Sequence, residues 1–480
     1  MQFLYLKKKI YMPQYLVWFG HNNSYFSHRF RELESVAHIH GVALKGLYEG
    51  KRPIALDSEP YAIVNLPGEE IAKSICKQCV LVKFLIELWG SGVTDELVLA
   101  NVRSQVDSQT WKAVFSGLTF SYKVSAYGAQ YSEKKRRSRM DAFASLFCND
   151  EKVDLKDPGI ILHIIDVYSH GCEITGTRDE SSSPSKLFCT FYGRQVGDVN
   201  TGEDRNEYVL TERPILGPTS LDNDLAFLMA NMAEIKSGSF VFDPFCGTGG
   251  LLVTATARGA TVVGTDIDTR VLRGDYISYV RNAISENMSK DIFQNFVHYG
   301  LNFPEVFAAD NSHPFWRRES VFDAILTDPP YGVRAGAKRI GSTTIHEICN
   351  RDTYYPQMVP YAPSDVVDDL LHVASRVLVN SGTLVYFLHV ELIDLFTAEE
   401  LEALPKNAAP SRTKLRTTSG KTHLYANECA RDDPFLNEAK IVERVVPMHP
   451  DFTFASAVLQ ILSAGTGRIL VKMKRNTRHE

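Results

Sequence analysis

Four aspartates stand at the ends of short apolar runs in the second half of the chain, a spacing that suits a ligand site. Asp243, Asp266, Asp310 and Asp328 end or follow "SFVFD", "ATVVGTD", "EVFAAD" and "FDAILTD". In an open α/β sheet, ligands bind beyond the carboxyl ends of the strands. A single strand-end aspartate is often a helix cap or a turn former. Four of them in successive units instead predict a shared site.

The first of these runs continues into a glycine-rich turn, "VFDPFCGTGGLL", with Gly247 and Gly249 where the backbone must pass close to a ligand. A pyrophosphate-binding turn needs a third glycine, but Leu252 stands there, and no P-loop lysine follows. S-adenosylmethionine fits better, because its amino acid end needs close backbone approach and its cationic centre favours an acid such as Asp243. The alternative is a tight connection between a strand and a helix.

The next two acids suit the rest of the same cofactor. Asp266 lies 23 residues after Asp243, close to the separation of about 20 residues at which a second-strand acid binds a ribose hydroxyl. Asp268 is expected to cap the following helix, although an exchange of roles between the two acids stays open. Asp310 is expected to accept from the adenine amine, and the alternative for it is a simple turn aspartate.

The segment "ILTDPPYGVR" places Asp328 before Pro329, Pro330 and Tyr331. The prolines lack backbone N–H groups, so they end the strand and leave carbonyl oxygens unpaired. These carbonyls and the Asp328 carboxylate accept hydrogen bonds, while Tyr331 offers a flat face for stacking. Such a set holds a nucleobase and directs the lone pair of its exocyclic amine toward a methyl group. Whether Asp328 also acts as a general base is left open.

The elements that must position these residues alternate between strand and helix from about Ser239, which predicts a parallel sheet with helices on both faces. A helix is predicted near 364–379, where Val366, Leu370 and Val377 belong to one apolar face. Two later apolar runs, "AKIVERVV" and "GRILVKMK", are candidates for strands at the sheet edge. Residues 12–192 differ, with mixed strands and helices that include a predicted strand at 159–168.

A dense basic cluster lies in that N-terminal half, although the chain of 480 residues has a net charge of −5 and a pI near 6.3. The cluster comprises Lys134, Lys135, Arg136, Arg137 and Arg139. A charge run is usually a solvated surface. Nucleic-acid contacts in an acidic protein must, however, come from such local patches.

Composition points to a multidomain globular enzyme, with 44% hydrophobic and 23% charged residues. No apolar run reaches the length of a membrane span, and we expect a cytoplasmic protein. Cys76 and Cys79 form a C-x-x-C without a second pair, so no metal site is expected. Ile75, Cys79 and Val82 begin a series at helical spacing that runs to Trp89, which favours buried free thiols on a helix.

The motifs "DPFCGTGG", "GTDID" and "TDPPYG" resemble, in this order, the amino-methyltransferases that use S-adenosylmethionine. With "ILGPTSLDNDLAFLMAN" and "TDPPYGVRAGAKRIG", the chain is similar to the eukaryotic and archaeal tRNA guanosine N2-methyltransferases that modify position ten. The resemblance implies a Rossmann-like class I methyltransferase sheet preceded by an α+β module that binds RNA, a THUMP domain. It predicts an N-terminal domain over 1–68, a THUMP-like domain over 69–192, a linker over 193–218 and a methyltransferase domain over 219–480.

The resemblance also assigns residues and partners. It implies that Thr219 and the turn from Asp243 to Gly250, including Pro244 and Phe245, border the cofactor, and that Asp328 to Tyr331 hold the guanine amine. It implies a tRNA substrate and a small zinc-binding activator subunit as a heterodimer partner. The segment 411–434 differs from the family pattern, so no role is assigned to it.

Three other functions remain open from the residues. The D-P-P-Y motif also suits a DNA adenine N6-methyltransferase or a methyltransferase acting on protein glutamine. The protein-directed enzymes usually carry Asn at the position of Asp328, and a DNA enzyme would need a module that reads the major groove. A non-catalytic RNA-binding subunit is the third alternative, but its glycines or its D-P-P-Y would be expected to have decayed.

Overall fold

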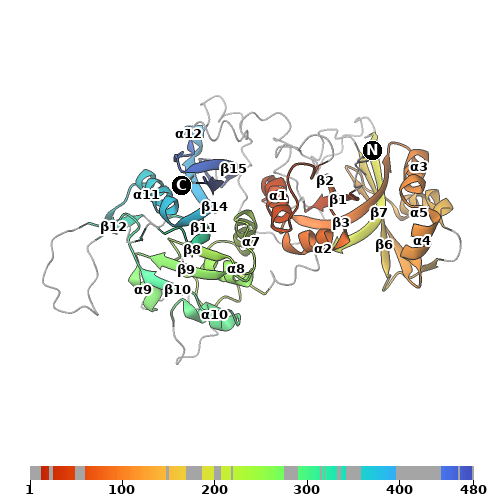
Figure 1. Cartoon of the computed structure of the whole chain (residues 1–480). Helices are drawn as coiled ribbons and strands as arrows, with labels where there is room; N and C mark the ends of the chain where they lie inside the picture. Colours follow the sequence, from red (N-terminus) through yellow and green to blue (C-terminus); the bar gives the residue numbers. More distant parts are fainter. Residues whose placement is uncertain are drawn as a thin grey trace, which may run out of the picture. The chain divides into compact units, whose positions relative to one another are not determined.

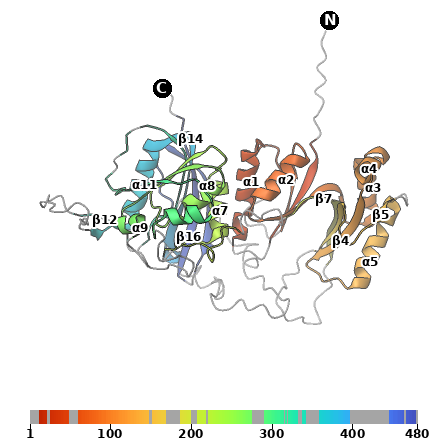
Figure 2. The same cartoon turned by 90° about the horizontal axis from the view of Figure 1, so that it is seen from below.

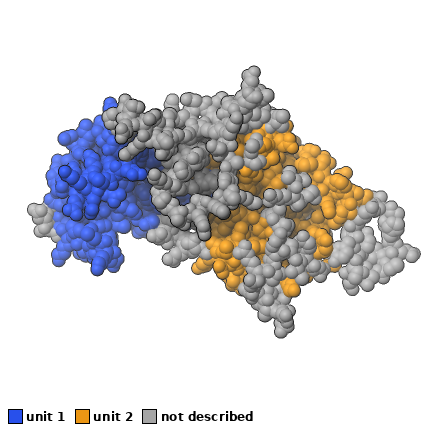
Figure 3. All heavy atoms as spheres, turned by 180° about the vertical axis from the view of Figure 1, so that it is seen from behind, with its two compact units in different colours: residues 1–26, 40–201, 418–428 blue, residues 27–39, 202–417, 429–480 orange. Residues whose placement is uncertain are grey.

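The computed structural model divides the chain into two compact units, drawn in two colours in Figure 3. Unit 1 comprises residues 1–26, 40–201 and 418–428, and unit 2 comprises residues 27–39, 202–417 and 429–480. The residues that the structure describes are 12–20, 25–48, 60–147, 151–168, 186–198, 207–217, 220–274, 290–313, 316–317, 319–331, 337–341, 358–395, 445–462 and 465–477.

Unit 1 is built on a mixed sheet whose described strands run in the order β2-β1-β3-β7-β6-β4-β5. Its strands are β1 (Gln14–Phe19), β2 (Tyr61–Asn65), β3 (Val82–Gly92), β4 (Thr119–Tyr127), β5 (Lys152–Val153), β6 (Ile160–Tyr168) and β7 (Leu187–Asp198). Its helices are α2 (Glu69–Gln78), α3 (Asp95–Gln105), α4 (Ser108–Phe115), α5 (Glu133–Ala142) and the 3-10 turn η2 (Ala144–Leu146). Aromatic side chains such as Trp18, Trp89 and Trp111 fill its core.

Two features of unit 1 differ from the sequence-based expectations. The helical pattern that includes Cys79 ends with α2 at Gln78, and the apolar residues from Val82 onward form β3. Residues 193–198, expected to be linker, are the second half of β7. Because β3 and β7 pair with each other between the N-terminal strands and β6, the regions 1–68 and 69–192 share one continuous sheet. The predicted strand at 159–168 is confirmed as β6.

Unit 2 contains the predicted parallel sheet, in the order β10-β9-β8-β11-β14-β16-β15 (Figure 1). The parallel strands are β8 (Phe240–Asp243), β9 (Thr261–Asp266), β10 (Glu305–Ala308), β11 (Phe322–Thr327) and β14 (Leu378–Glu391), and β15 (Phe452–Ile461) and β16 (Thr466–Arg475) add an antiparallel edge. The order reverses between β8 and β11, which makes their carboxyl ends the switch point where ligands bind in such sheets.

Helices cover both faces of this sheet, α11 on one and α7 and α8 on the other (Figure 2). The helices of unit 2 are α1 (Arg29–Ile39), α7 (Asn223–Met232), α8 (Gly250–Ala257), α9 (Thr269–Arg273), α10 (Phe293–His298), α11 (Pro363–Val377) and α12 (Leu392–Leu395), with η1 (Phe26–His28) before α1. The strands β12 (Lys338–Ile340) and β13 (Met358–Pro360) form a separate two-stranded antiparallel sheet. The predicted helix near 364–379 is confirmed as α11, and its residues Val366, Leu370 and Val377 are buried.

Helix α1 comes from the N-terminal region of the chain but packs into unit 2, against α7. Asn231 donates a 2.7 Å hydrogen bond from Nδ2 to Oε1 of Glu32. The Lys472 ammonium on β16 lies 2.9 Å from Oγ of Ser35 and 2.7 Å from a carboxylate oxygen of Glu234. These polar contacts fasten the helix to both the start and the end of the unit 2 chain.

Some expectations fall on residues that the structure does not describe. Thr219, most of "AKIVERVV" and the segment 411–434 lie outside the described residues, whereas "GRILVKMK" is confirmed as part of β16. Cys76 and Cys79 are buried free thiols, and burial raises the pKa of Cys76 to about 12. Within the described part of the chain, helices are too short or too polar to cross a membrane.

Candidate active site

The acids of strands β8, β9 and β11 lie beside one another at the carboxyl edge of the unit 2 sheet. Asp243 ends β8, Asp266 ends β9 in the neighbouring position, and Asp328 directly follows β11. The Thr327 hydroxyl donates a 2.7 Å hydrogen bond to Oδ1 of Asp243, which also accepts from the Phe245 backbone N–H. The parallel pairing thus brings together residues that lie 84 positions apart in the chain.

The glycine-rich turn after Asp243 has the conformation that its sequence predicts. Gly247 and Gly249 have φ angles of +49° and +77°, a region where side chains are strained. A Cβ on Gly249 would also lie 2.8 Å from the Ile292 side chain. Asp266 stabilises the turn, because its Oδ2 accepts a hydrogen bond from the Gly247 N–H at 2.8 Å.

The two acids of "GTDID" have separate roles in the structure. The second, Asp268, is the N-cap of α9 and accepts a 3.1 Å hydrogen bond from the Arg270 N–H, as predicted. The first, Asp266, accepts from the Asp268 N–H at 2.8 Å as well as from Gly247. The backbone of Ile267 also contributes a hydrogen bond to this carboxylate, which leaves part of its acceptor capacity for a ligand.

Asp310 lies beyond β10 and shapes its own turn. One carboxylate oxygen accepts from the Ser312 N–H and hydroxyl, at 2.9 and 2.7 Å, and the other accepts from the Ile340 N–H at 2.8 Å. This geometry matches the alternative of a turn aspartate. An adenine amine would therefore have to bind carboxylate oxygens that already accept hydrogen bonds from the protein. The neighbouring Asn311 donates from Nδ2 to the Pro244 carbonyl at 2.6 Å and so joins this turn to the glycine-rich one.

The D-P-P-Y segment contacts a histidine that the sequence analysis did not single out. His389 on β14 places Nε2 3.5 Å from Oδ1 of Asp328, and neither atom has a hydrogen-bond partner among the described residues. The imidazole stacks on the ring of Tyr331, with the ring planes 16° apart. Pro329 is buried and anchors the segment, whereas Asp328 and Pro330 are partly exposed at the carboxyl edge of the sheet.

Phe245 and Cys246 serve packing within the turn. Phe245 packs against Ala337, Tyr361 and Val366, which links the glycine-rich turn to the region after Tyr331. Cys246 is 5% exposed, and burial raises the pKa of its thiol well above the ordinary value. A thiol held in its neutral form is a poor nucleophile, in keeping with the absence of any predicted role for it in catalysis.

The electrostatics of the acids favour a cationic ligand. Burial raises the pKa of Asp243 to about 7, and the negative charges of Asp266 and Asp328 add to that increase. Burial also raises the pKa of Asp266. A positive charge placed among these carboxylates would relieve their mutual repulsion and stabilise their ionised forms.

A pH-dependent stability follows from Asp243. Its folded pKa of about 7 exceeds the ordinary value of 3.8, so its ionisation destabilises the folded protein increasingly from pH 4 to pH 7 and by a constant amount above. We expect Asp243→Asn to raise the unfolding free energy of the ligand-free protein at pH 8 by on the order of 2 to 4 kcal/mol, and with it the melting temperature. At pH 4 the substitution should change both quantities little. Calorimetric scans of both proteins across this range test the expectation; parallel curves contradict it.

The basic cluster of unit 1 splits into two kinds of residue. Lys134, Lys135, Arg136 and Arg137 are exposed on α5, and the Arg137 side chain is 73% exposed. Arg139 is only 7% exposed, which corrects its assignment to RNA. Its guanidinium is already bound by carboxylates and has no surface to offer a phosphate.

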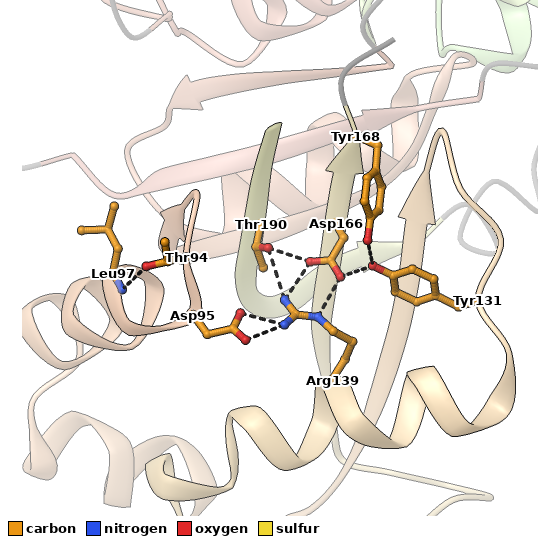
Figure 4. Close-up of polar contacts among 8 residues, drawn as sticks. All are labelled: Thr94, Asp95, Leu97, Tyr131, Arg139, Asp166, Tyr168 and Thr190. Atoms are coloured by element: carbon orange, nitrogen blue, oxygen red, sulfur yellow. Dashed lines mark hydrogen bonds and ion pairs between the residues drawn. The ribbon is translucent and has the colours of Figure 1, made fainter. Parts of the chain in front are cut away.

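Figure 4 shows the polar contacts that hold Arg139. Its Nη1 donates to both oxygens of Asp95 at 2.7 Å, and Nε and Nη2 donate to the two oxygens of Asp166 at 2.7 and 2.8 Å. Asp166, 1% exposed, also accepts from the hydroxyls of Thr190 and Tyr131. This network joins α5 to β6, β7 and the start of α3.

Comparisons with known proteins agree with this architecture. A family model described as Tmrp11 THUMP N-terminal domain matches residues 13–200, and one described as RMKL-like, methyltransferase domain matches residues 211–351. The tRNA (guanine(10)-N(2))-methyltransferase TRMT11 of Dictyostelium discoideum is 33% identical over 78% of this chain and 74% of its own length. The protein of the same name from Rattus norvegicus is 34% identical over 69% of this chain and 70% of its own length. The one from Gallus gallus is 30% identical over 90% of this chain and 82% of its own length.

Proposed function

The chain belongs to the family of tRNA (guanine(10)-N(2))-methyltransferases, and from this membership we propose how its own residues divide the work. It transfers a methyl group from S-adenosylmethionine to the guanine N2 in tRNA. The observation that carries the assignment of the site is the meeting of Asp243, Asp266 and Asp328 at the β8–β11 switch point. The alternatives of a DNA, protein-directed or non-catalytic homologue are set aside by the family.

The residues at this edge fit the cofactor. Positive φ angles at Gly247 and Gly249 allow close backbone approach, and the carboxylates of Asp243 and Asp266 suit a ligand that carries positive charge. When bound, S-adenosylmethionine supplies an activated methyl group. We assign the ribose hydroxyls to Asp266, which has lone pairs to spare, and the adenine end to the turn of Asp310. Thr219 keeps its proposed place beside the cofactor on the family resemblance alone.

The methyl acceptor belongs with the D-P-P-Y segment. The Asp328 carboxylate and a proline carbonyl accept the two N2 hydrogens of guanine, which orients the nitrogen lone pair toward the methyl carbon. When N2 receives the methyl group it loses a proton, which Asp328 or a water molecule would take up. His389 orients the Asp328 carboxylate from one side and supports the Tyr331 ring on which the base stacks.

The exposed half of the basic cluster is proposed to contact tRNA phosphates. Its residues Lys134, Lys135, Arg136 and Arg137 occupy the first turns of α5, after the N-cap Ser132. Cations near a helix N-terminus are unfavourable, because the helix dipole is positive there. A bound anion would offset that cost, and the region around the cluster matches the family model described as a THUMP N-terminal domain.

We expect the double substitution Arg136→Gln, Arg137→Gln to weaken tRNA binding and to flatten its salt dependence. Each lost phosphate contact should reduce the slope of log affinity against log salt by roughly 0.7 to 0.9. Filter binding at several salt concentrations measures the slope, and cofactor affinity serves as the control because the cofactor residues lie in unit 2. An unchanged slope would show that the cluster is a solvated surface.

A small zinc-binding activator subunit is proposed as a partner, on the resemblance and on one surface of unit 2. Strand β10 has a described neighbour only on the β9 side, and the exposed side chains of Phe303 and Val297 lie close to it in sequence. A strand edge without a described neighbour, together with exposed apolar side chains, suits a second chain. We also propose a cytoplasmic location, in keeping with the composition.

One experiment tests the function and the partner together. The purified chain is incubated with labelled S-adenosylmethionine and unmodified tRNA, with and without the candidate activator, and the labelled nucleoside is mapped. The expected product is N2-methylguanosine at position ten, with a higher yield when the activator is present. A different labelled position overturns the site assignment, and full activity of the monomeric chain alone overturns the proposed partner.

A further inference from the structure

Arg213 is a buried cation without a carboxylate partner among the described residues, and it lies beside the glycine-rich turn. Its side chain is 1% exposed. Nη2 donates a hydrogen bond to the Tyr208 carbonyl at 3.5 Å, and Nε has no hydrogen-bond partner within the described part of the chain. Buried arginines are normally paired, since an isolated charge is costly away from water.

The surroundings of Arg213 do little to compensate its charge. The nearby rings of Tyr208, Tyr299 and Phe227 pack against one another. Burial lowers the pKa of Arg213, and the proximity of the Tyr299 hydroxyl opposes that change only in part. The charge therefore lies among neutral groups.

One guanidinium nitrogen of Arg213 lies beside the first residue of α8. A Cβ built on Gly250, the first residue of that helix, would lie 3.1 Å from Nη1 of Arg213. The N-cap residue Gly249 provides no side-chain cap, and the first turn contains no acidic residue. A cation and the positive end of a helix dipole thus lie side by side, and no carboxylate of the described residues is hydrogen-bonded to the guanidinium.

The position of Arg213 is fixed by its neighbours. Asn295 accepts from the Ile215 N–H at 2.9 Å and donates to the carbonyls of Ile215 and Thr248, both at 3.0 Å. These bonds tie the segment that carries Arg213 to the glycine-rich turn itself. The arginine is consequently a fixed part of this turn.

We propose that Arg213 and the uncapped N-terminus of α8 form the anion subsite that binds the α-carboxylate of the cofactor's methionine moiety. This inference rests on the proposed function and deepens it. A carboxylate is an acceptor-only anion that a guanidinium and helix N–H groups bind with charge-assisted hydrogen bonds. A tRNA phosphate does not suit the site, because the glycine-rich turn beside Arg213 is assigned to the cofactor.

Decarboxylated S-adenosylmethionine, which retains the sulfonium and the amine but lacks this carboxylate, isolates the interaction. Calorimetric titration of the full chain should show that the wild type binds S-adenosylmethionine at least about ten-fold more tightly than the decarboxylated form, as expected for a charged hydrogen-bonded contact. In Arg213→Gln that preference should fall to within about two-fold. Equal affinities in the wild type overturn the proposal without any variant. If neither ligand binds, the proposed cofactor itself is wrong.

Stability separates this role from a structural one. Removal of a cation that has no carboxylate partner should leave the melting temperature of the ligand-free Arg213→Gln protein unchanged or raised. Arg258 at the C-cap of the same helix is the matched control, since it lies over the Phe227 ring at the favourable end of the dipole. Arg258→Gln should lower the melting temperature and keep the ligand preference. If Arg213→Gln lowers the melting temperature and weakens the binding of both ligands by the same factor, the arginine is structural. Arg213→Lys keeps the charge and should retain part of the preference for S-adenosylmethionine.

Discussion

Asp328→Ala should lower the rate of methyl transfer by about 100-fold or more while cofactor affinity stays within a few-fold. The carboxylate is assigned to the N2 amine of guanine, a contact that strengthens as the nitrogen becomes pyramidal in the transition state. The cofactor is assigned to other residues, chiefly Asp243 and Asp266. Single-turnover rates with tRNA and titrations with the cofactor measure the two effects separately.

Two companion variants sharpen this test. His389→Gln keeps a polar side chain but removes the ring beside Asp328 and Tyr331, and we expect an intermediate loss, roughly ten-fold, of the single-turnover rate. Asp368→Asn removes an exposed carboxylate from α11 and should have no effect. An Asp328→Ala protein that turns over at the wild-type rate would falsify the assignment of the guanine amine to this segment.

Arg139→Gln should destabilise unit 1 by about 3 to 5 kcal/mol, the usual cost of breaking a buried ion pair by removal of one partner. The substitution leaves Asp166, which is 1% exposed, with hydroxyl partners but no cation. Denaturant unfolding followed by tryptophan fluorescence is a suitable measurement, because Trp18, Trp89 and Trp111 all belong to unit 1 and only Trp316 belongs to unit 2.

Arg137 supplies the matched control, two positions away on the same helix. Its guanidinium is 73% exposed and lies 3.6 Å from an oxygen of Glu133, so Arg137→Gln should change stability by less than about 0.5 kcal/mol. The two substitutions remove the same charge from the same run of sequence. Equal stabilities of the two variants would contradict the structural role given to Arg139.

The catalytic unit could be predicted well from sequence because its signals are local. Each strand of unit 2 that ends in or precedes an aspartate was recognisable as a short apolar run, and the apolar face of α11 identified that helix. The glycines of the turn predicted a close approach of the backbone to a ligand, and the structure shows positive φ angles at Gly247 and Gly249. Residue type and spacing suffice to predict an element when the same few residues determine both its backbone conformation and its chemical role.

Other features depend on contacts that no local pattern records. The run from Val80 to Trp89 is apolar except for Lys83 and Glu87, so the pattern did not separate a helix from a strand. Pairing with β1 and β7 makes it a strand. Arg139 looks like its neighbours in the sequence, and only the distant Asp95 and Asp166 make it a core residue. His389 was available as a polar residue near the carboxyl end of the strand next to β11, a signal that the sequence analysis did not use.

The docking of α1 into unit 2 has a consequence for how the protein is made. Ser35 and Lys472 bond to each other across 437 positions of the chain, so the ribosome must synthesise all the residues between them before this contact can form. The sheet of unit 1, which ends with β7 at Asp198, can form early in synthesis, whereas α1 must wait for α7 and then for β16 to emerge. Contacts of such long sequence separation slow folding and lengthen exposure to aggregation. We therefore expect the catalytic unit to mature after translation and to be the part of the chain that benefits most from chaperones.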